Sequence, residues 1–343
     1  MKMTNDALAD IVTIAMIPRD TFAMSNQVLD RLVETTPPGV KVIVVDSGAG
    51  QGPRDYMEKV CKQNGFALFR SSDIATPNQA RNAAIKHVAT KYVAFVDNDT
   101  LVTEGWLKPL VECAEETGAW AVGPTICERM PEATWLHGYD GELEIRQARD
   151  GRRYYHDFHY NAHVKLDSVR SKLKRQETPI LEFHAKLVAM EAFMALGAYN
   201  ESIVNMYEYG DFLLKAQAHG RKIMLEPASV VTYVPPRGIP PEDRKFFELR
   251  WSEVWTDLTY EAMAEQHGLT LDHPDWKRPH NLVRSQRMFG KSWLRKPRRW
   301  LGHSRLRWLE RKLLVPIDVW INRLKYPASK YGKIQPVEFV RVN

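Results

Sequence analysis

Short apolar runs alternate with amphipathic stretches through the first third of the chain, and this alternation constrains the fold more than any other feature. Runs that suit buried strands occupy residues 10–17, 41–46, 66–69, 93–97 and 119–124. Stretches that suit helices lie between them, at residues 25–34, 53–64, 77–88 and 106–117. Repeated strand–helix units of this length favour a doubly wound sheet with right-handed crossovers. We therefore predict an α/β fold in which helices flank a mostly parallel sheet.

Two aspartates, Asp97 and Asp99, stand directly after the apolar run 93–96. Ligands of open α/β sheets bind in the crevice outside the carboxyl ends of the strands, so charge is useful at this position. Alternation along an extended chain points Asp97 and Asp99 the same way, with Asn98 opposed. The pair can hold one Mg²⁺ or Mn²⁺ ion together with water and substrate phosphate oxygens. An isolated Asp-x-Asp is more often a turn and a helix N-cap, so neighbouring residues must decide.

A third carboxylate and a cation accompany the pair. Asp46 also ends a predicted strand, and Arg81 lies at the start of the helix predicted from residue 77, where the helix dipole favours anions. A nucleotide in this crevice can offer a base N–H to Asp46, a ribose hydroxyl to Asp97 and a pyrophosphate to a metal on Asp99. Taken alone, Arg81 is equally well explained as a surface arginine.

Composition restricts the class of protein. The chain has 343 residues, 44% of them hydrophobic and 26% charged, which is ordinary for a soluble globular protein. It has no uninterrupted apolar run of roughly 20 residues and no apolar secretion signal at residues 1–10. Cys61, Cys113 and Cys127 are odd in number and lack metal-ligand spacing. We expect a cytoplasmic protein, either free or peripheral on the cytoplasmic face of a membrane.

Six short motifs in a fixed order carry a family resemblance. They are Ile-Pro-Arg at 17–19, Val-Ile-Val-Val-Asp at 42–46, Ala-Arg-Asn at 80–82, Phe-Val-Asp-Asn-Asp-Thr at 95–100, Gly-Trp-Leu at 105–107 and Val-Gly-Pro at 122–124. The series resembles the nucleotide-binding half of the family 2, GT-A type glycosyltransferases. The resemblance implies a UDP- or GDP-sugar donor and a Mn²⁺ or Mg²⁺ cofactor. It implies these roles: Pro18, Asp46, Arg81 and Asp97 for the donor, and Asp97 and Asp99 for the metal.

The acceptor side departs from that family. Many relatives have Glu-Asp-x-Asp where this chain has Glu208-Tyr209-Gly210-Asp211, and the second residue of the motif is their general base. A tyrosine with an ordinary pKa near 10 is a poor base at neutral pH. We predict Glu208 as the base, with Asp211 as the second candidate; Asp211 is otherwise explained as a helix N-cap. Relatives also carry a metal-binding histidine after their last strand, at a position that Tyr233 occupies here.

The sequence also contains a histidine cluster and a basic C-terminal segment. His156, His159 and His163 lie among aromatic residues without zinc-site spacing, which favours a loop over the acceptor pocket or plain packing. From residue 291 to 325, lysines and arginines alternate with tryptophans and leucines. This pattern suits a helical cap or a homo-oligomer contact, and it also suits an anionic membrane surface. We expect no nucleic acid partner, because no groove-reading motif accompanies the charge.

These observations predict a GT-A domain over residues 1–240, with its nucleotide-sugar half at about 8–130 and its acceptor half at about 131–240. A basic amphipathic helical extension follows at 241–343. The predicted reaction moves a sugar from a nucleotide diphosphate sugar to a hydroxyl of a saccharide or lipid-linked glycan, with inversion, in polysaccharide biosynthesis. One alternative is a noncatalytic sugar-binding scaffold protein, given the altered motif at Tyr209. A nucleotidyltransferase is the other, although the chain lacks a glycine-rich loop after the first strand.

Overall fold

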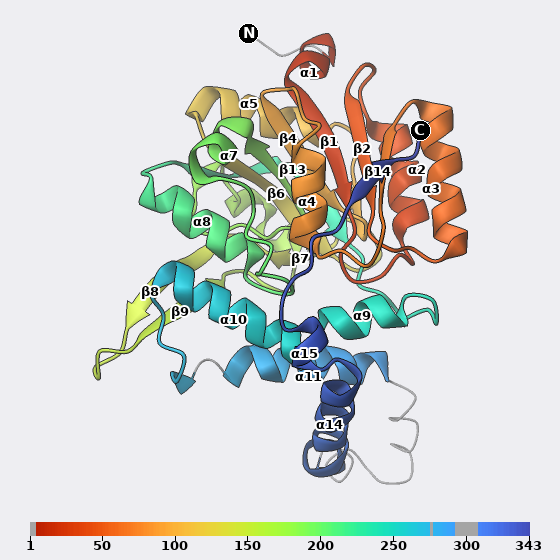
Figure 1. Cartoon of the computed structure of the whole chain (residues 1–343). Coiled ribbons are helices and arrows are strands. Elements are labelled where there is room, and N and C mark those ends of the chain that lie inside the picture. The colour runs from red at the N-terminus through yellow and green to blue at the C-terminus, as the bar shows by residue number, and fades with distance from the viewer. Residues whose placement is uncertain (1–4, 275–276, 292–307) are drawn as a thin grey trace.

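One large sheet organises the protein, seen in a computed structural model that describes residues 5–274, 277–291 and 308–343 (Figure 1). Its strands follow the order β10-β7-β6-β12-β4-β1-β2-β3-β14, and β5, β11 and β13 join it off this path. Helices cover both of its faces, and a group of helices from the last third of the chain packs beneath it. These features confirm the predicted fold class, an α/β sheet flanked by helices with a C-terminal helical extension.

The first half of the sheet is parallel. Strands β4, β1, β2 and β3 pair side by side, with Ile17 of β1 level with Asp97 of β4. The elements of this half are α1 (Asn5–Ile11), β1 (Val12–Ile17), α2 (Ser25–Thr35), β2 (Lys41–Asp46), α3 (Gln51–Asn64), β3 (Ala67–Ser71), α4 (Pro77–Ile85), β4 (Tyr92–Asp97), β5 (Thr100–Val102), α5 (Leu107–Thr117) and β6 (Ala121–Glu128). Every strand and helix predicted here is present. The one notable shift is that Asp10 and Ile11 belong to α1 and not to β1.

The second half adds antiparallel strands to that core. Strand β12 lies between β4 and β6 and runs antiparallel to both, whereas β13 is parallel to β6. Strands β8 and β9 form a separate hairpin. The elements are β7 (Trp135–Gly138), β8 (Gly141–Gln147), β9 (Arg153–His159), β10 (Val164–Lys165), α6 (Leu166–Val169), η1 (Arg170–Lys172), β11 (Gln176–Glu177), β12 (Ala185–Ala189), α7 (Met190–Leu196), α8 (Glu208–Ala218) and β13 (Ile223–Tyr233).

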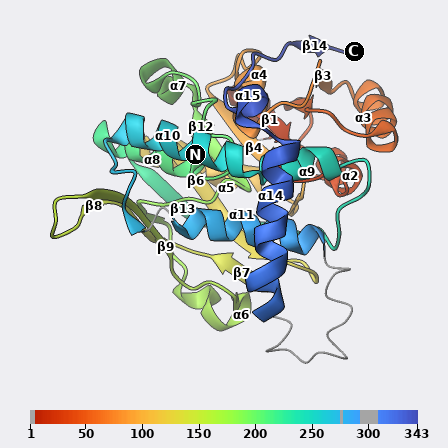
Figure 2. The same ribbon diagram turned by 60° about the horizontal axis from the view of Figure 1, so that its bottom comes forward.

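The C-terminal helices pack under the carboxyl ends of the parallel strands (Figure 2). They comprise α9 (Arg244–Arg250), α10 (Glu253–His267), α11 (Lys277–Gly290), η4 (Glu310–Leu314), α14 (Val315–Lys325) and α15 (Ala328–Tyr331). α9 and α10 are separate helices, because the side chain of Ser252 caps a new helix by accepting the N–H of Trp255. Strand β14 (Phe339–Arg341) then returns to pair antiparallel with β3.

Membrane-spanning potential is absent from the described residues, because none of their helices combines the length and apolarity that a span requires.

Candidate functional site

The carboxyl ends of β2 and β4 bring two predicted aspartates to the same edge of the sheet, with Pro18 after β1 between them. Asp46 is fully buried, and its Oδ1 accepts the N–H groups of Gly48 and Ala49 at 3.0 and 2.8 Å. Its Oδ2 pairs with the Arg70 guanidinium at 2.8 Å. Only β1 separates β2 from β4, so Asp46 and Asp97 lie about 10 Å apart across the sheet.

Asp97 lies between two arginines. Its Oδ2 is 2.8 Å from Nη1 of Arg19, and its Oδ1 is 3.5 Å from Nη2 of Arg81. Arg81 is itself buried, with its guanidinium over the rings of Phe183 and Tyr199. Arg81 is therefore a core cation beside Asp97 and not a surface arginine.

Asp99 lies near Asp97, as the strand alternation predicts, while Asn98 points into the loop after β1. The Asn98 amide accepts the N–H of Arg19 and donates to the Thr21 carbonyl. Ligand atoms of Asp97, Asp99 and His184 all lie within 4.8 Å of one another. Two of the buried atoms in this group, Oδ2 of Asp99 and Nδ1 of His184, have no hydrogen-bond partner. Buried polar atoms without partners are rare, and a bound cation would satisfy both.

The protonation of this group suits a metal. Burial and the adjacent Asp97 raise the pKa of Asp99 well above its usual range, because a negative charge at this position is not fully compensated by the neighbouring side chains; a bound cation would compensate it. Burial and Arg19 lower the pKa of His184 well below its usual range, which leaves the imidazole neutral. A neutral imidazole and two carboxylates form a donor set that Mn²⁺ accepts readily.

His184 is the candidate metal ligand that the sequence interpretation missed. The position expected for a third ligand holds Tyr233, and in the structure the Tyr233 ring stacks on the His184 ring with centroids 4.0 Å apart. His184 immediately precedes β12, whose first residue, Ala185, pairs with Val96. A histidine just before an apolar strand was the available signal. That signal connects His184 with Asp97 only when the antiparallel pairing of β12 with β4 is known.

Carboxylates pair with the histidines of the predicted cluster. Of the predicted cluster, His156 contacts Glu142, His159 contacts Glu182 at 3.0 Å and His163 contacts Glu128 at 2.7 Å. The three imidazoles therefore pair with separate carboxylates and do not form one common group. Glu182 and His137 also have ligand atoms within 4.8 Å of those of His184. Groups of this kind behind a metal-binding histidine fix its orientation.

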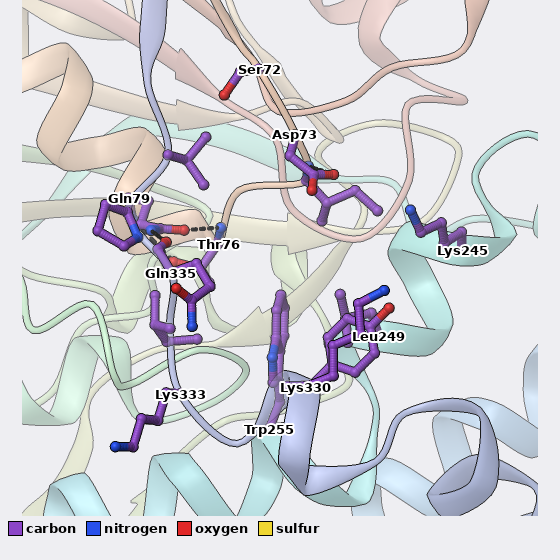
Figure 3. Close-up of a pocket in the computed structure, with 15 residues that line it drawn as sticks. Ser72, Asp73, Thr76, Gln79, Lys245, Leu249, Trp255, Lys330, Lys333 and Gln335 are labelled. Carbon is purple, nitrogen blue, oxygen red and sulfur yellow. Dashed lines mark hydrogen bonds between the residues drawn. The ribbon is translucent and has the colours of Figure 1, made fainter.

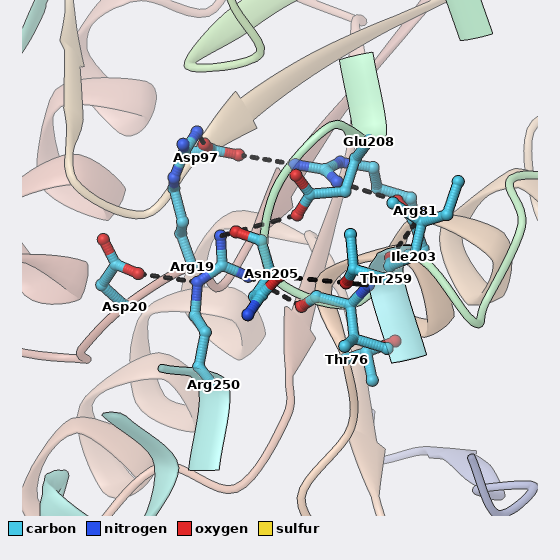
Figure 4. A network of polar contacts seen from close by, with 12 residues as sticks. Arg19, Asp20, Thr76, Arg81, Asp97, Ile203, Asn205, Glu208, Arg250 and Thr259 are labelled. Carbon is cyan, nitrogen blue, oxygen red and sulfur yellow. Dashed lines mark hydrogen bonds and ion pairs between the residues drawn. The ribbon is translucent and has the colours of Figure 1, made fainter. Parts of the chain in front are cut away.

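Glu208 begins α8 and faces a group of arginines (Figure 4). Its carboxylate is buried, with Oε1 3.5 Å from Nη2 of Arg250. Burial alone would raise the pKa of Glu208, but Arg250, Arg81 and Arg19 lower it below its usual value. Glu208 is therefore a buried, ionised carboxylate.

The other residues of the altered motif face elsewhere. Asp211 pairs with Lys215 at 2.8 Å and with His267 at 2.9 Å, and the Tyr209 hydroxyl donates to Asp157 at 2.6 Å. A Cβ at Gly210 would lie 2.3 Å from the Tyr155 hydroxyl oxygen, so only glycine fits there. Within this motif, Glu208 is the residue that faces the arginines.

Arg250 was also missed from sequence. It lies on α9, in the C-terminal extension, and its Nε is 2.7 Å from Oδ1 of Asp20 in the loop after β1. Figure 4 shows Arg19, Arg81 and Arg250 converging on the carboxylates of the site. Arginines of this kind recognise phosphate oxygens through two parallel hydrogen bonds. Nothing in the local sequence around Arg250 signals this placement.

A separate pocket of about 400 Å³ lies between the loop after β3 and the C-terminal segment (Figure 3). Its lining includes Trp255 and the lysines Lys245, Lys330 and Lys333. None of the predicted site residues lines it. The carboxylates and arginines above therefore form a different, closely packed site.

Known proteins resemble parts of this chain in sequence. Residues 24–182 match the family model described as Glycosyl transferase family 2, which confirms the resemblance seen in the sequence for this part of the chain. The succinoglycan biosynthesis protein ExoM of Rhizobium meliloti (strain 1021) is 28% identical over 141 residues. That match covers 40% of this chain and 46% of ExoM, so the chain spans about half the length of this relative.

Two solved structures match this chain at low sequence identity. The crystal structure of GalNAc-T7 with UDP, GalNAc and Mn²⁺ has a TM-score of 0.48 and 13% identity, covering 83% of this chain and 57% of that chain. The mannosyltransferase PcManGT from Pyrobaculum calidifontis, in complex with GDP-Man and Mn²⁺, has a TM-score of 0.48 and 15% identity, covering 91% and 83%.

Proposed function

We propose that this chain, whose residues 24–182 match glycosyl transferase family 2, transfers a sugar from a UDP- or GDP-sugar to a hydroxyl of a saccharide or lipid-linked glycan. The observation that carries the proposal is the group Asp97, Asp99 and His184, in which two buried ligand atoms have no hydrogen-bond partner. The group lies at the sheet edge where α/β folds bind nucleotides. Because the relative ExoM is named for succinoglycan biosynthesis, we extend the proposal to polysaccharide biosynthesis.

The donor nucleotide would lie along the ends of β1, β2 and β4. We assign Asp46 and Pro18 to the base, Asp97 to the ribose, and Arg81 to the base or phosphates. The buried Asp46 carboxylate is already fixed by backbone N–H groups, which supports a binding surface that is preformed. Fixed donors and acceptors lower the entropy cost of binding.

Asp97, Asp99 and His184 would hold Mn²⁺ or Mg²⁺. The imidazole favours Mn²⁺, because Mg²⁺ prefers an all-oxygen shell. When bound, the cation supplies positive charge to the leaving diphosphate. Arg19, 2.8 Å from Asp97, supplies further positive charge at the same place.

Glu208 is the proposed general base, with Asp211 as the second candidate. An inverting displacement needs a carboxylate within hydrogen-bond reach of the acceptor hydroxyl, on the face of the sugar opposite the leaving nucleotide. Glu208 is ionised and buried, and Arg250 holds its side chain from one side. Asp211 is engaged by Lys215 and His267, which makes it less available to a substrate.

The domain boundary remains the one proposed from sequence, with a GT-A domain over 1–240 and an extension over 241–343. Because Arg250 lies in the extension and contacts Asp20 and Glu208, we propose that the extension contributes to the site. We also propose that the protein works in the cytoplasm, where reducing conditions suit its free, buried cysteines.

A binding protein without transferase activity is the second candidate, since Tyr209 stands at the usual base position. One experiment separates the two. The full chain is titrated with UDP- and GDP-sugars, with and without Mn²⁺, while release of nucleotide diphosphate is followed. We expect one sugar class to bind in a metal-dependent way and to be turned over. Metal-dependent binding without release would favour the binding protein, and no binding of any donor would overturn the proposal.

A further inference from the structure

Helix α14 has its polar side against the protein and its apolar side exposed. Asp318 and Asn322, four residues apart on one face, are buried. Asp318 pairs with Arg287 at 2.7 Å and also with Lys291, while Asn322 accepts the N–H of Glu253 at 3.0 Å. Helices that dock on a globular core normally present their apolar side to it. In α14 the arrangement is reversed.

The opposite face of α14 carries large hydrophobic side chains. Ile317, Trp320, Ile321 and Leu324 follow the i, i+3, i+4, i+7 spacing of one helical face, and their exposed fractions are 44, 63, 45 and 63%. Leu313 and Trp308, in the preceding turns, are 50 and 62% exposed. Figure 1 shows α14 projecting from the lower end of the molecule, away from the sheet. We call the six side chains the α14 apolar face.

The amino-acid sequence of the C-terminal segment indicates the chemistry of the partner. Residues 291–343 contain 14 lysines and arginines but only 3 aspartates and glutamates, whereas the whole chain has a net charge of +6. Arg311 and Lys312 on η4 and Arg323 on α14 are exposed. Tryptophans and aliphatic side chains flanked by cations are typical of helices that lie in the interface of an anionic bilayer. Indole rings favour the headgroup level in particular.

We propose that the α14 apolar face docks this protein on an anionic lipid bilayer, with α14 lying in the plane of the membrane. The buried Asp318–Arg287 pair fixes the helix so that its apolar side stays turned outward without lipid. The inference stands independently of the proposed function, because it rests on residues outside the carboxylate site.

The test uses point substitutions, because β14 pairs with β3 and removal of the tail would expose a sheet edge. The full chain is sedimented with vesicles of phosphatidylcholine containing phosphatidylglycerol, and with phosphatidylcholine alone. We expect binding to the anionic vesicles that weakens with salt. The triple variant Ile317→Ser, Trp320→Ser, Leu324→Ser should lower the partition coefficient at least about tenfold, because burial of each side chain contributes to docking.

A matched control is Met194→Ser on α7, which removes an 81% exposed hydrophobic side chain from a different part of the surface. It should partition like the wild type. If the triple variant unfolds, the paired charge reversals Arg311→Glu and Lys312→Glu give a second test and should weaken anionic binding. Equal partitioning of every variant would overturn the proposal. The proposal would also be overturned if the wild type bound neither kind of vesicle. It would be overturned as well if the wild type formed a dimer that only the triple variant failed to form.

Discussion

The two halves of the site differ in how their residues reach it. In the parallel half, Asp46 and Asp97 end strands and Arg81 lies in the first turns of a helix, so each follows from its local element. In the second half, His184 precedes an antiparallel strand, Glu208 begins a helix and Arg250 lies in the C-terminal extension. Arg250 meets Asp20 across 230 positions of sequence. The comparison teaches that a strand-end rule finds Asp46 and Asp97, while the placement of His184, Glu208 and Arg250 depends on long-range packing.

The strongest test of the parallel half is Asp99→Asn. Loss of this carboxylate should lower metal-dependent transfer about a thousandfold or more, because a bound cation contributes several kcal/mol to stabilising the leaving group. Titration with Mn²⁺ and turnover of the donor check the result. The control is Asp55→Asn, an exposed aspartate on α3, which should change neither. Unaltered Mn²⁺ affinity in Asp99→Asn would remove the metal assignment.

Glu208→Gln tests the second half. It should lower transfer about a hundredfold to a thousandfold while the donor dissociation constant stays within a few-fold, because general bases act on the chemical step. Donor titration and single-turnover transfer measure the two effects separately. Asp211→Asn is the comparison, and it should affect folding stability more than the rate of transfer, since its partners are Lys215 and His267. Full activity in Glu208→Gln would move the base to Asp211.

The variant His184→Gln tests whether His184 completes the metal site proposed at Asp97 and Asp99. We expect apparent Mn²⁺ affinity to fall about tenfold to a hundredfold, less than for Asp99→Asn, because both carboxylates remain. The dependence of transfer rate on Mn²⁺ concentration measures it. His156→Gln serves as the control, since its imidazole pairs with Glu142 and belongs to neither candidate metal group. If His184→Gln and His156→Gln changed the apparent Mn²⁺ affinity equally, His184 would be a packing residue and not a metal ligand.

Particular residues show what the sequence could and could not predict. Five strands and four helices of the first half follow from apolar runs and from helix caps such as Gly65 and Gly118, which adopt the left-handed conformation expected of them. The insertion of β12 between β4 and β6 was not predictable locally, because an apolar run does not state its direction or its neighbours. The sequence interpretation therefore found Tyr233 where relatives have a histidine and named no third ligand, whereas in the structure the imidazole beside Asp97 belongs to His184.

The smallest expected effect concerns the C-terminal extension. It is a change with pH in how much His280 contributes to folding stability. His280 lies 3.3 Å from both Glu253 and Asp257, and although burial lowers its pKa, these carboxylates raise it to about 8. Since the folded-state pKa exceeds the unfolded one, this stabilisation is fully present below about pH 6.5 and is lost as the pH rises through 8. The stability difference between wild type and His280→Gln should therefore shrink by about 1 kcal/mol between about pH 6 and pH 9, after allowance for solvent screening. Urea unfolding at the two pH values measures it. A difference that stays constant would show that the ion pairs of His280 do not stabilise the extension that carries Arg250.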